Sequence, residues 1–331
     1  MADLLDRFEP AIRDAFLEAV REVTSKARVA DIAKALERGD VQGALDALYM
    51  DRSAFETFER AIEEAYGEGG KAVIDDLGRL RDADGNGFVV RFDVRNLRAE
   101  QWLKEHSSRL VTRIIQEQRL NIRNALEEGM REGNNPRTVA LDIVGRIDRQ
   151  TGRRTGGIVG LSWPQERAVA NARRELESGD FAAYRQRERR DRRFDRTIAK
   201  AEREGRGLTA KEISTIISRY SDRLLKLRGD TIGRTEALAS LHAAQHEALQ
   251  QLVDTGKVQA SQIRRVWDAT GDARTRLDHL AADSQSVGLN ETFTVGGRQM
   301  KYPGDPAGGP EQVINCRCVV RVRIDFLANV G

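Results

Sequence analysis

The sequence is poor in cysteine, proline and aromatic residues. Its 331 residues include two cysteines and six prolines, and aromatic residues make up 5%. Two cysteines separated by one residue exclude the disulfide framework of a small secreted domain. We therefore expect the protein to stay in a reducing compartment or in a particle assembled there. The low proline content excludes collagen and mucin-like stalks, and a hydrophobic content of 40% excludes an acidic disordered tail.

Long hydrophobic runs are also absent. No window approaches the ~20 consecutive apolar residues of a transmembrane helix, so we expect no membrane partner. The first residues, Met1-Ala2-Asp3-Leu4-Leu5-Asp6, are acidic, whereas a secretory signal starts with basic residues. A chain of this length can form two or three domains, each with its own core.

Basic residues are concentrated in the middle of the chain. The 55 Lys+Arg and 52 Asp+Glu residues give a net charge of +3, and 46 of the basic residues are arginines. Residues 1–145 have a net charge of −6, residues 146–196 of +6, and the remainder of +3. The planar guanidinium of arginine binds phosphate or carboxylate through two N–H groups at once. A GC-rich coding sequence also raises the frequency of arginine. The near-neutral total therefore hides a basic central segment.

Apolar residues recur at helical spacing over most of the chain. A long helix is predicted from about Ala99 to Glu128, with Gly129 or Gly133 as its end. Helical patterning resumes from Thr209 to Leu252, with a helix opening near Thr231. Since the opposite faces of these helices are charged, packing against partner helices must supply their stability.

The last 75 residues differ from the rest of the chain. Arg264–Asp268 and Val319–Ile324 alternate like half-buried strands, and turn-forming Gly and Pro residues lie between them. The predicted core of this module is Trp267, Phe293, Tyr302 and Val320.

The sequence thus predicts a mainly α protein, with an elongated helical N-terminal body and a small C-terminal α+β domain. By composition it divides into an N-terminal helical segment (1–80), a turn or extended segment with a long helix (81–150), a basic helical middle region (151–225) and the C-terminal domain (226–331).

Two loops contain patterns that are typical of ligand-binding loops. Asp82-Ala83-Asp84-Gly85-Asn86-Gly87 matches the first half of a calcium loop, but Asp93 stands where that loop needs a longer Glu. We favour a turn followed by a strand-like segment. Residues 152–157 are rich in glycine but lack the Lys-Ser/Thr of a phosphate-binding loop, so we expect a flexible joint there.

The segment from Tyr184 to Arg196 is dense in arginine. Glu188, Asp191 and Asp195 lie among its arginines, so much of the charge can pair within a helix. A solvated helix face and a surface for nucleic acid or an acidic partner both remain open. The candidate DNA-binding residues are Arg185, Arg187, Arg189, Arg190, Arg192, Arg193 and Arg196.

His279, Asp283, Cys316 and Cys318 form a candidate set of four zinc ligands. Their spacing does not resemble a zinc ribbon or finger, and a bend at Asn315 would be needed to bring the thiols together. We favour buried thiols and a His–Asp hydrogen bond that locks the loops, with no bound metal. A cysteine nucleophile beside His279 is an alternative, but no oxyanion hole or specificity pocket is recognisable.

His242 and His246 lie four residues apart on a predicted helix, a spacing that can place two imidazoles on one metal. The sequence His242-Ala243-Ala244-Gln245-His246 lacks the Glu that follows the first His of a metalloprotease. We therefore expect surface or interface histidines.

Several short motifs follow one another in the C-terminal third. They are Thr231-Ile232-Gly233-Arg234-Thr235-Glu236-Ala237, Val266-Trp267-Asp268, Arg274-Thr275-Arg276 with His279, Glu291-Thr292-Phe293, Tyr302-Pro303-Gly304-Asp305-Pro306 and Ile314-Asn315-Cys316-Arg317-Cys318. This ordered set, over residues 225–326, resembles the C-terminal domain of tailed-phage head morphogenesis proteins, the Mu F-like minor head (minor capsid) proteins. Residues 226–331 are thus the expected Mu F-like domain.

The resemblance implies a structural role for the motif residues, and the family has no settled catalytic residues. These structural residues are Arg234, Thr235, Glu236, Trp267, Arg274, Arg276, His279, Tyr302, Pro303, Gly304, Asp305, Asn315, Cys316 and Cys318. We expect Arg274 and Arg276 to fix the loops by pairing with Asp268, Asp283 or Asp305.

The resemblance also implies a virion protein, in the capsid interior or at the portal vertex, that resides in the host cytoplasm during assembly. Its expected partners are the portal protein, which several copies surround, capsid or scaffold proteins, and double-stranded DNA bound without sequence preference during packaging or ejection. We expect no enzyme activity and no cofactor. Two alternatives remain: a hydrolase or transferase that uses His279, Asp283 and Cys316/Cys318, and a zinc-stabilised interaction module.

Overall fold

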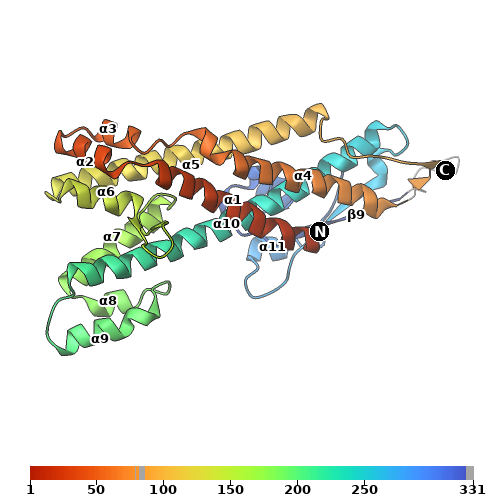
Figure 1. Cartoon of the computed structure of the whole chain (residues 1–331). Helices are drawn as coiled ribbons and strands as arrows, with labels where there is room; N and C mark the ends of the chain where they lie inside the picture. Colours follow the sequence, from red (N-terminus) through yellow and green to blue (C-terminus); the bar gives the residue numbers. More distant parts are fainter. Residues whose placement is uncertain (79, 82–85, 326–331) are drawn as a thin grey trace. The chain divides into compact units, whose positions relative to one another are not determined.

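The computed structural model describes residues 1–78, 80–81 and 86–325 (Figure 1). These residues form a mainly α-helical protein with a small α+β region near the C-terminus, which confirms the predicted fold class. No helix of the described residues has the length and apolar composition needed to cross a membrane. Residues 82–85 of the calcium-loop pattern lie outside the described residues, so that pattern stays a prediction.

Packing divides the chain into two compact units, each assembled from separate stretches of sequence. Unit 1 comprises Met1–Ala15, Thr57–Ser108 and Asp230–Gly331, and unit 2 comprises Phe16–Glu56 and Arg109–Gly229. The four segments predicted from the sequence divide the chain by composition, whereas these units divide it by packing. Among the described residues, α1 (Ala2–Lys26), α5 (Leu97–Arg131) and α10 (Ala210–Asp254) each contribute a long stretch to both units, and α4 (Glu56–Leu77) contributes only its first residue, Glu56, to unit 2.

Short helices make up the rest of unit 2, and polar side chains begin several of them. The Asp40 carboxylate accepts a hydrogen bond from Gly43 N, and the Asn135 side chain accepts from Arg137 N and Thr138 N. The elements are α2 (Val29–Glu37), α3 (Val41–Asp46), η1 (Arg52–Phe55), α6 (Pro136–Val144), β3 (Arg146–Ile147), β4 (Arg154–Thr155), α7 (Trp163–Ser178), α8 (Phe181–Arg185), η2 (Arg192–Phe194) and α9 (Asp195–Arg203).

The predicted long helices are confirmed, with two corrections to their ends. Gly129 does not end α5 but lies inside it, where a Cβ would come within 2.8 Å of Val139 Cγ2. Gly133, with φ of +70°, follows the helix as its left-handed terminator. Thr231 does not open a helix, because α10 runs through it without a break.

The glycine-rich connector at residues 152–157 is not the flexible joint that we predicted. Gly156 N donates a hydrogen bond to Asp222 Oδ1 of α10 at 2.6 Å. Gly157 has a φ of +83°, and a Cβ there would lie 2.5 Å from Gly145 N. Glycine is therefore needed for a left-handed backbone packed closely against its neighbours, and not for mobility.

Unit 1 contains α4 (Glu56–Leu77), the paired strands β1 (Leu80–Arg81) and β2 (Gly87–Phe88), and the C-terminal α+β module. The elements of the module are η3 (Ala260–Gln262), β5 (Ile263–Asp268), α11 (Leu277–Ala281), β6 (Ser286–Gly288), β7 (Phe293–Val295), β8 (Arg298–Met300), η4 (Pro306–Gly308), α12 (Pro310–Val313) and β9 (Val319–Ile324). Three strands form an antiparallel sheet in the order β6-β5-β9, and β7 pairs with β8.

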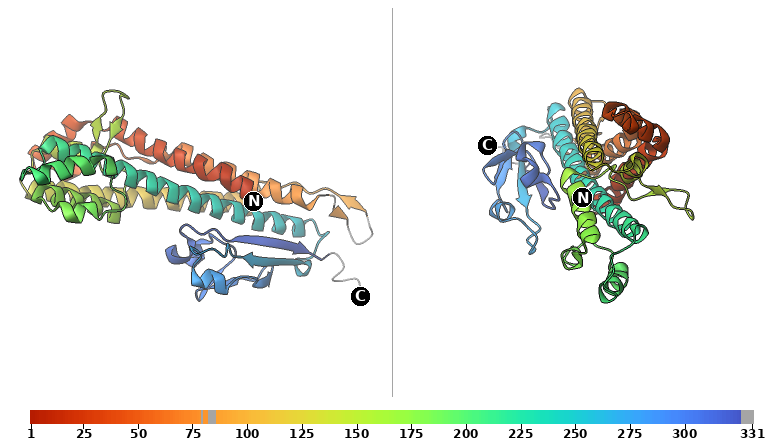
Figure 2. Two further views of the ribbon diagram at one scale, coloured as in Figure 1. Left: turned by 90° about the horizontal axis from the view of Figure 1, so that it is seen from below. Right: turned by 90° about the vertical axis from the view of Figure 1, so that its left-hand side faces the viewer.

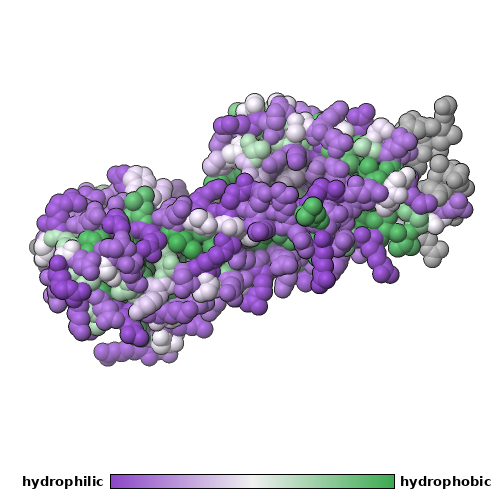
Figure 3. Space-filling view, turned by 90° about the horizontal axis from the view of Figure 1, so that it is seen from above, coloured by the Kyte–Doolittle hydropathy of each residue, from purple (hydrophilic) through white to green (hydrophobic). Residues whose placement is uncertain are grey.

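The module packs its sheet against the C-terminal half of α10. Figure 2 shows β5 and β9 beside this part of the helix. Trp267, Phe293, Tyr302 and Val320 are all buried in one hydrophobic cluster, as predicted. The outer surface is different: the face drawn in Figure 3 is mostly hydrophilic, and hydrophobic residues form only separate patches on it. Charged outer helix faces around an apolar core explain this contrast.

Candidate functional site

His279, Cys316 and Cys318 come together in the interior of unit 1. His279 lies on α11, and the two cysteines directly precede β9. The exposed fraction is 1% for His279 and 2% for each cysteine. His279 Nδ1 lies 3.3 Å from Cys318 Sγ and 3.5 Å from Cys316 Sγ. Asn315, with φ of 56°, supplies the bend that brings both thiols to the histidine.

A hydrogen-bonded chain fixes the orientation of the His279 ring. Its Nε2 lies 3.0 Å from Gln312 Oε1, and Gln312 Nε2 donates to Asp278 Oδ2 at 2.8 Å. Because the carboxylate can only accept, the Gln312 amide must turn its oxygen toward His279. Nε2 therefore carries the proton, and the Nδ1 lone pair faces the two thiols. Neither Gln312 nor Asp278 belongs to a recognisable ligand spacing, so both were missed in the sequence.

Asp283 does not join this cluster, so the predicted His–Asp hydrogen bond is wrong. Its carboxylate is exposed and accepts a hydrogen bond from Ala269 N at 2.8 Å. Asp283 therefore binds the backbone of the loop that follows β5, and it does not contact His279. An enzyme that relied on His279 and Asp283 together would lack that contact.

The two thiols differ in acidity because they share one hydrogen bond. The hydrogen bond from Cys316 lowers the pKa of Cys318, and the Thr270 backbone N–H acts in the same direction. The same bond and burial raise the pKa of Cys316. Cys318 is therefore the sulfur that holds negative charge more readily.

We predicted surface or interface histidines at positions 242 and 246; His242 is not at the surface, and His246 is half-buried. His242 is fully buried; its Nε2 accepts from Val320 N at 3.3 Å, and its Nδ1 lies 3.1 Å from Leu238 O. His246 Nδ1 lies 3.4 Å from Arg265 Nη1. Burial lowers the pKa of His242 to about 4 and that of His246 to about 3. Both rings are therefore neutral at pH 7 and serve to join α10 to the sheet.

Arg265 is a buried structural residue that we did not single out from the sequence. Only 2% of it is exposed, and its guanidinium donates to the carbonyl oxygens of Gly288, Glu291 and Lys301. The group also lies over the Phe293 ring, 5.4 Å from its centroid. Burial lowers the pKa of Arg265 to about 10. Strand alternation could have revealed it, since Arg265 shares its face with Ile263 and Trp267.

Motif residues of α10 hold neighbouring elements of unit 1. Thr235 Oγ1 accepts a hydrogen bond from Asn315 N at 3.1 Å. Arg234 pairs with Glu9 at 3.1 Å, and Glu236 lies 2.7 Å from His106 Nε2. These residues thus connect α10 to the loop before β9 that contains the two cysteines, to α1 and to α5.

The Tyr302–Asp305 motif forms a tight turn against α10. Gly304 has φ of +88°, and a Cβ there would lie 3.0 Å from Ala239 Cα. Pro303 and Tyr302 are buried beside it, and the Asp305 carboxylate accepts from Lys301 N at 2.7 Å. Glycine is required here for both backbone conformation and close approach.

Arg274 and Arg276 do not make the ion pairs that we predicted. Arg274 is exposed and reaches Asp272, in the same turn, at 3.6 Å, and Arg276 donates to the backbone oxygen of Ile314. Asp268 pairs instead with Arg321 across the sheet at 3.0 Å. Arg274 therefore pairs with an acid of its own turn, and Asp268 pairs with the arginine opposite it in the sheet, in place of the ion pairs that we predicted.

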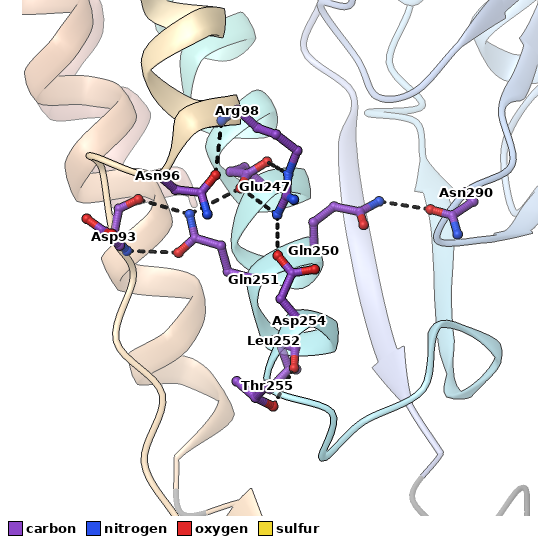
Figure 4. Close-up of polar contacts among 10 residues, drawn as sticks. All are labelled: Asp93, Asn96, Arg98, Glu247, Gln250, Gln251, Leu252, Asp254, Thr255 and Asn290. Atoms are coloured by element: carbon purple, nitrogen blue, oxygen red, sulfur yellow. Dashed lines mark hydrogen bonds and ion pairs between the residues drawn. The ribbon is translucent and has the colours of Figure 1, made fainter.

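A polar network ties residues 93–98 to the end of α10 (Figure 4). Gln251 forms two hydrogen bonds with the backbone of Asp93, from its N at 2.8 Å and to its O at 2.9 Å. Arg98 pairs with Glu247 at 3.1 Å and with Asp254 at 2.5 Å. The carboxylate of Asp93, the last position of the calcium-loop pattern, accepts from Arg95 N.

The basic segment from Tyr184 to Arg196 is not one helix, which corrects our prediction. α8 ends at Arg185, η2 covers Arg192–Phe194, and α9 starts at Asp195. Asp191 is buried and accepts a hydrogen bond from Arg193 N, so it begins the short 3-10 helix. A side chain that competes with the helical backbone explains the break.

Four of the seven candidate arginines in this segment are neutralised by carboxylates. These ion pairs are Arg185–Glu202 at 2.8 Å, Arg187–Glu175 at 2.5 Å, Arg190–Asp195 at 3.0 Å and Arg193–Asp191 at 2.5 Å. Arg189, Arg192 and Arg196 are exposed, and within the described part of the chain they have no ion-pair partner.

Residues 196–321 match the family model described as Phage Mu protein F like protein. The match covers α10 and the module up to β9, and it includes the motif residues whose contacts are described above. No curated protein and no solved structure matches the chain. The family is one of structural phage head proteins and not a known enzyme family, which indicates a place in the virion. Residues 196–321 are therefore similar to the Mu F-like family of phage head morphogenesis proteins.

Proposed function

We propose that this head morphogenesis protein associates with the portal and contacts double-stranded DNA without sequence preference during packaging or delivery. Several copies would surround the portal and meet capsid or scaffold proteins there. The family match supports the role in head assembly. The observation that carries the DNA contact is the set of exposed arginines without carboxylate partners in the described part of the chain: Arg189, Arg192 and Arg196.

These three arginines fit a phosphate backbone better than the other four of the segment. An arginine already paired with a carboxylate has its charge largely neutralised and fewer N–H groups left to bind a phosphate. An exposed and unpaired guanidinium loses only water, and it can bind a phosphate oxygen through its planar fork. Contacts of this kind position DNA without reading its sequence, and they weaken as the salt concentration rises, because counterion release then becomes less favourable.

We expect the triple variant Arg189→Gln, Arg192→Gln, Arg196→Gln to bind DNA more weakly than the unchanged protein. The slope of log affinity against log salt should become shallower by about 0.9 for every phosphate that the variant no longer binds. The measurement is a salt titration of binding to two duplexes of unrelated sequence, which should respond equally.

A matched control removes the same charge elsewhere in unit 2. Arg113, Arg131 and Arg137 are also exposed, so their replacement by Gln gives the same change in net charge. The control should keep the original salt slope. Equal weakening by both triple variants would mean that only the total charge matters, and unchanged binding by the first variant would remove the segment from the DNA interface.

The portal association is tested by coexpression with the portal protein of the same phage. We expect the chain to copurify with the portal ring in several copies per ring, and to remain bound when the three arginines are replaced. Separation of the chain from both portal rings and procapsids under assembly conditions would contradict the proposal. A variant that binds portal but not DNA would separate the two interactions.

A further inference from the structure

We propose that His279, Cys316 and Cys318 bind one zinc ion that clamps the loop before β9 to α11. Ligands of the two types that zinc prefers, imidazole and thiolate, converge there from two separate elements, and their ligand atoms all lie within 4.8 Å of one another. Asp283, the fourth residue of the ligand set suggested by the sequence, takes no part.

The separations of the ligand atoms fit a tetrahedral ion. Zinc binds a thiolate at ~2.3 Å and an imidazole nitrogen at ~2.0–2.1 Å, so two ligands at a tetrahedral angle place nitrogen and sulfur about 3.5 Å apart. His279 Nδ1 lies 3.3 Å from Cys318 Sγ and 3.5 Å from Cys316 Sγ. An ion could therefore enter between the three atoms with small side-chain movements.

The surroundings of His279 match those of a metal-binding histidine. Such a histidine usually donates its other ring N–H to a neighbouring oxygen, which fixes both tautomer and orientation. Here Nε2 faces Gln312 Oε1, and Asp278 holds the Gln312 amide in place. Nδ1 is left as an unprotonated donor of an electron pair that points at the thiols. These contacts orient the His279 ring so that its Nδ1 can bind a metal ion together with the two thiols.

The ligand set favours zinc over other divalent ions. Two thiolates and one imidazole are poor ligands for magnesium or calcium, which prefer oxygen. Two thiolates also neutralise the charge of the ion, which allows it to lie in a buried position. Three protein ligands leave the fourth position to a water molecule.

The test uses the full chain purified under reducing conditions without chelator or metal-affinity resin. We expect elemental analysis to find one zinc per chain, and cobalt added to chelator-treated protein to give thiolate-to-metal charge-transfer absorption. Cys316→Ser and Cys318→Ser should each lose this absorption. Gln312→Leu should weaken cobalt affinity about 10–100-fold, because it removes the group that orients His279.

The variant His106→Gln is the matched control, since it changes a histidine of unit 1 outside the cluster and should keep the metal. If a cysteine variant does not fold, the proposal is tested on the unchanged protein. Removal of metal by a chelator should lower its melting temperature, and zinc but not magnesium should restore that temperature. The proposal is overturned if folded, reduced protein contains no zinc and takes up no cobalt. It is equally overturned if Cys316 and Cys318 are found joined in a disulfide in the freshly purified protein.

Discussion

Replacement of Trp267 by alanine is expected to lower the free energy of unfolding by about 3–5 kcal/mol. The Trp267 side chain is fully buried on β5, at the centre of the apolar cluster between the sheet and α10. Its ring lies edge-on to Phe293 at 5.3 Å and to His279 at 5.7 Å. Truncation would remove these ring contacts and leave a cavity that a close-packed module cannot fill. Chemical denaturation followed by circular dichroism measures the loss.

The variant Trp267→Phe separates the loss of packing from the loss of the indole N–H. Within the described residues, Trp267 Nε1 has no hydrogen-bond partner, so phenylalanine removes a buried donor that was unsatisfied. We therefore expect a much smaller loss than with alanine. Equal destabilisation by the two variants would contradict this view of the core, because it would mean that the indole contributes through a polar contact.

Replacement of Arg265 by methionine is expected to cost about 3 kcal/mol or more, although methionine is apolar and similar in length. The substitution leaves the carbonyl oxygens of Gly288, Glu291 and Lys301 buried without their common donor, and each unsatisfied group costs about 1–3 kcal/mol. Lysine should not restore stability, because one ammonium group cannot reproduce the planar fork that reaches all three oxygens. Denaturant unfolding of the three proteins provides the measurement.

The neighbouring residue supplies the control for Arg265. Arg264 is exposed on the opposite face of β5, directly across from Arg323 of β9. Arg264→Met removes the same chemical group, yet we expect a change within about 0.5 kcal/mol, since surface substitutions rarely do more. Removal of one of two facing like charges acts in the stabilising direction. Similar losses at both positions, or full rescue by Arg265→Lys, would disprove the buried role of Arg265.

Much of the fold could be predicted from the sequence because it depends on local periodicity. The helical spacing of apolar residues predicted two long helices, which are present as α5 and α10. The strand alternation around Trp267 and Val320 likewise predicted two strands that pair in the sheet. Local patterns of this kind survive folding, since the apolar face of an element has only the core to pack against.

The details of the candidate site could not be predicted, because they depend on residues far apart in the sequence. His279 and Gln312 are 33 residues apart, and no spacing rule joins them. Asp283 is nearer in sequence, but its carboxylate binds the backbone of Ala269. Glycine occurs both in flexible joints and where the backbone is left-handed and closely packed. From the sequence we predicted a flexible joint at Gly156 and Gly157, but these glycines are closely packed. The residue types limited which side chains could form the site, but tertiary contacts determined which of them come together.

The division of the chain into interleaved stretches has a consequence for its synthesis. All residues of unit 2 have left the ribosome once Gly229 has emerged, whereas Met1–Ala15 and Thr57–Ser108 must wait for the residues that follow Asp230. We infer that unit 2 matures first while the apolar faces of unit 1 stay temporarily uncovered. The nascent protein would then depend on chaperones for longest in the very part that carries the family motifs.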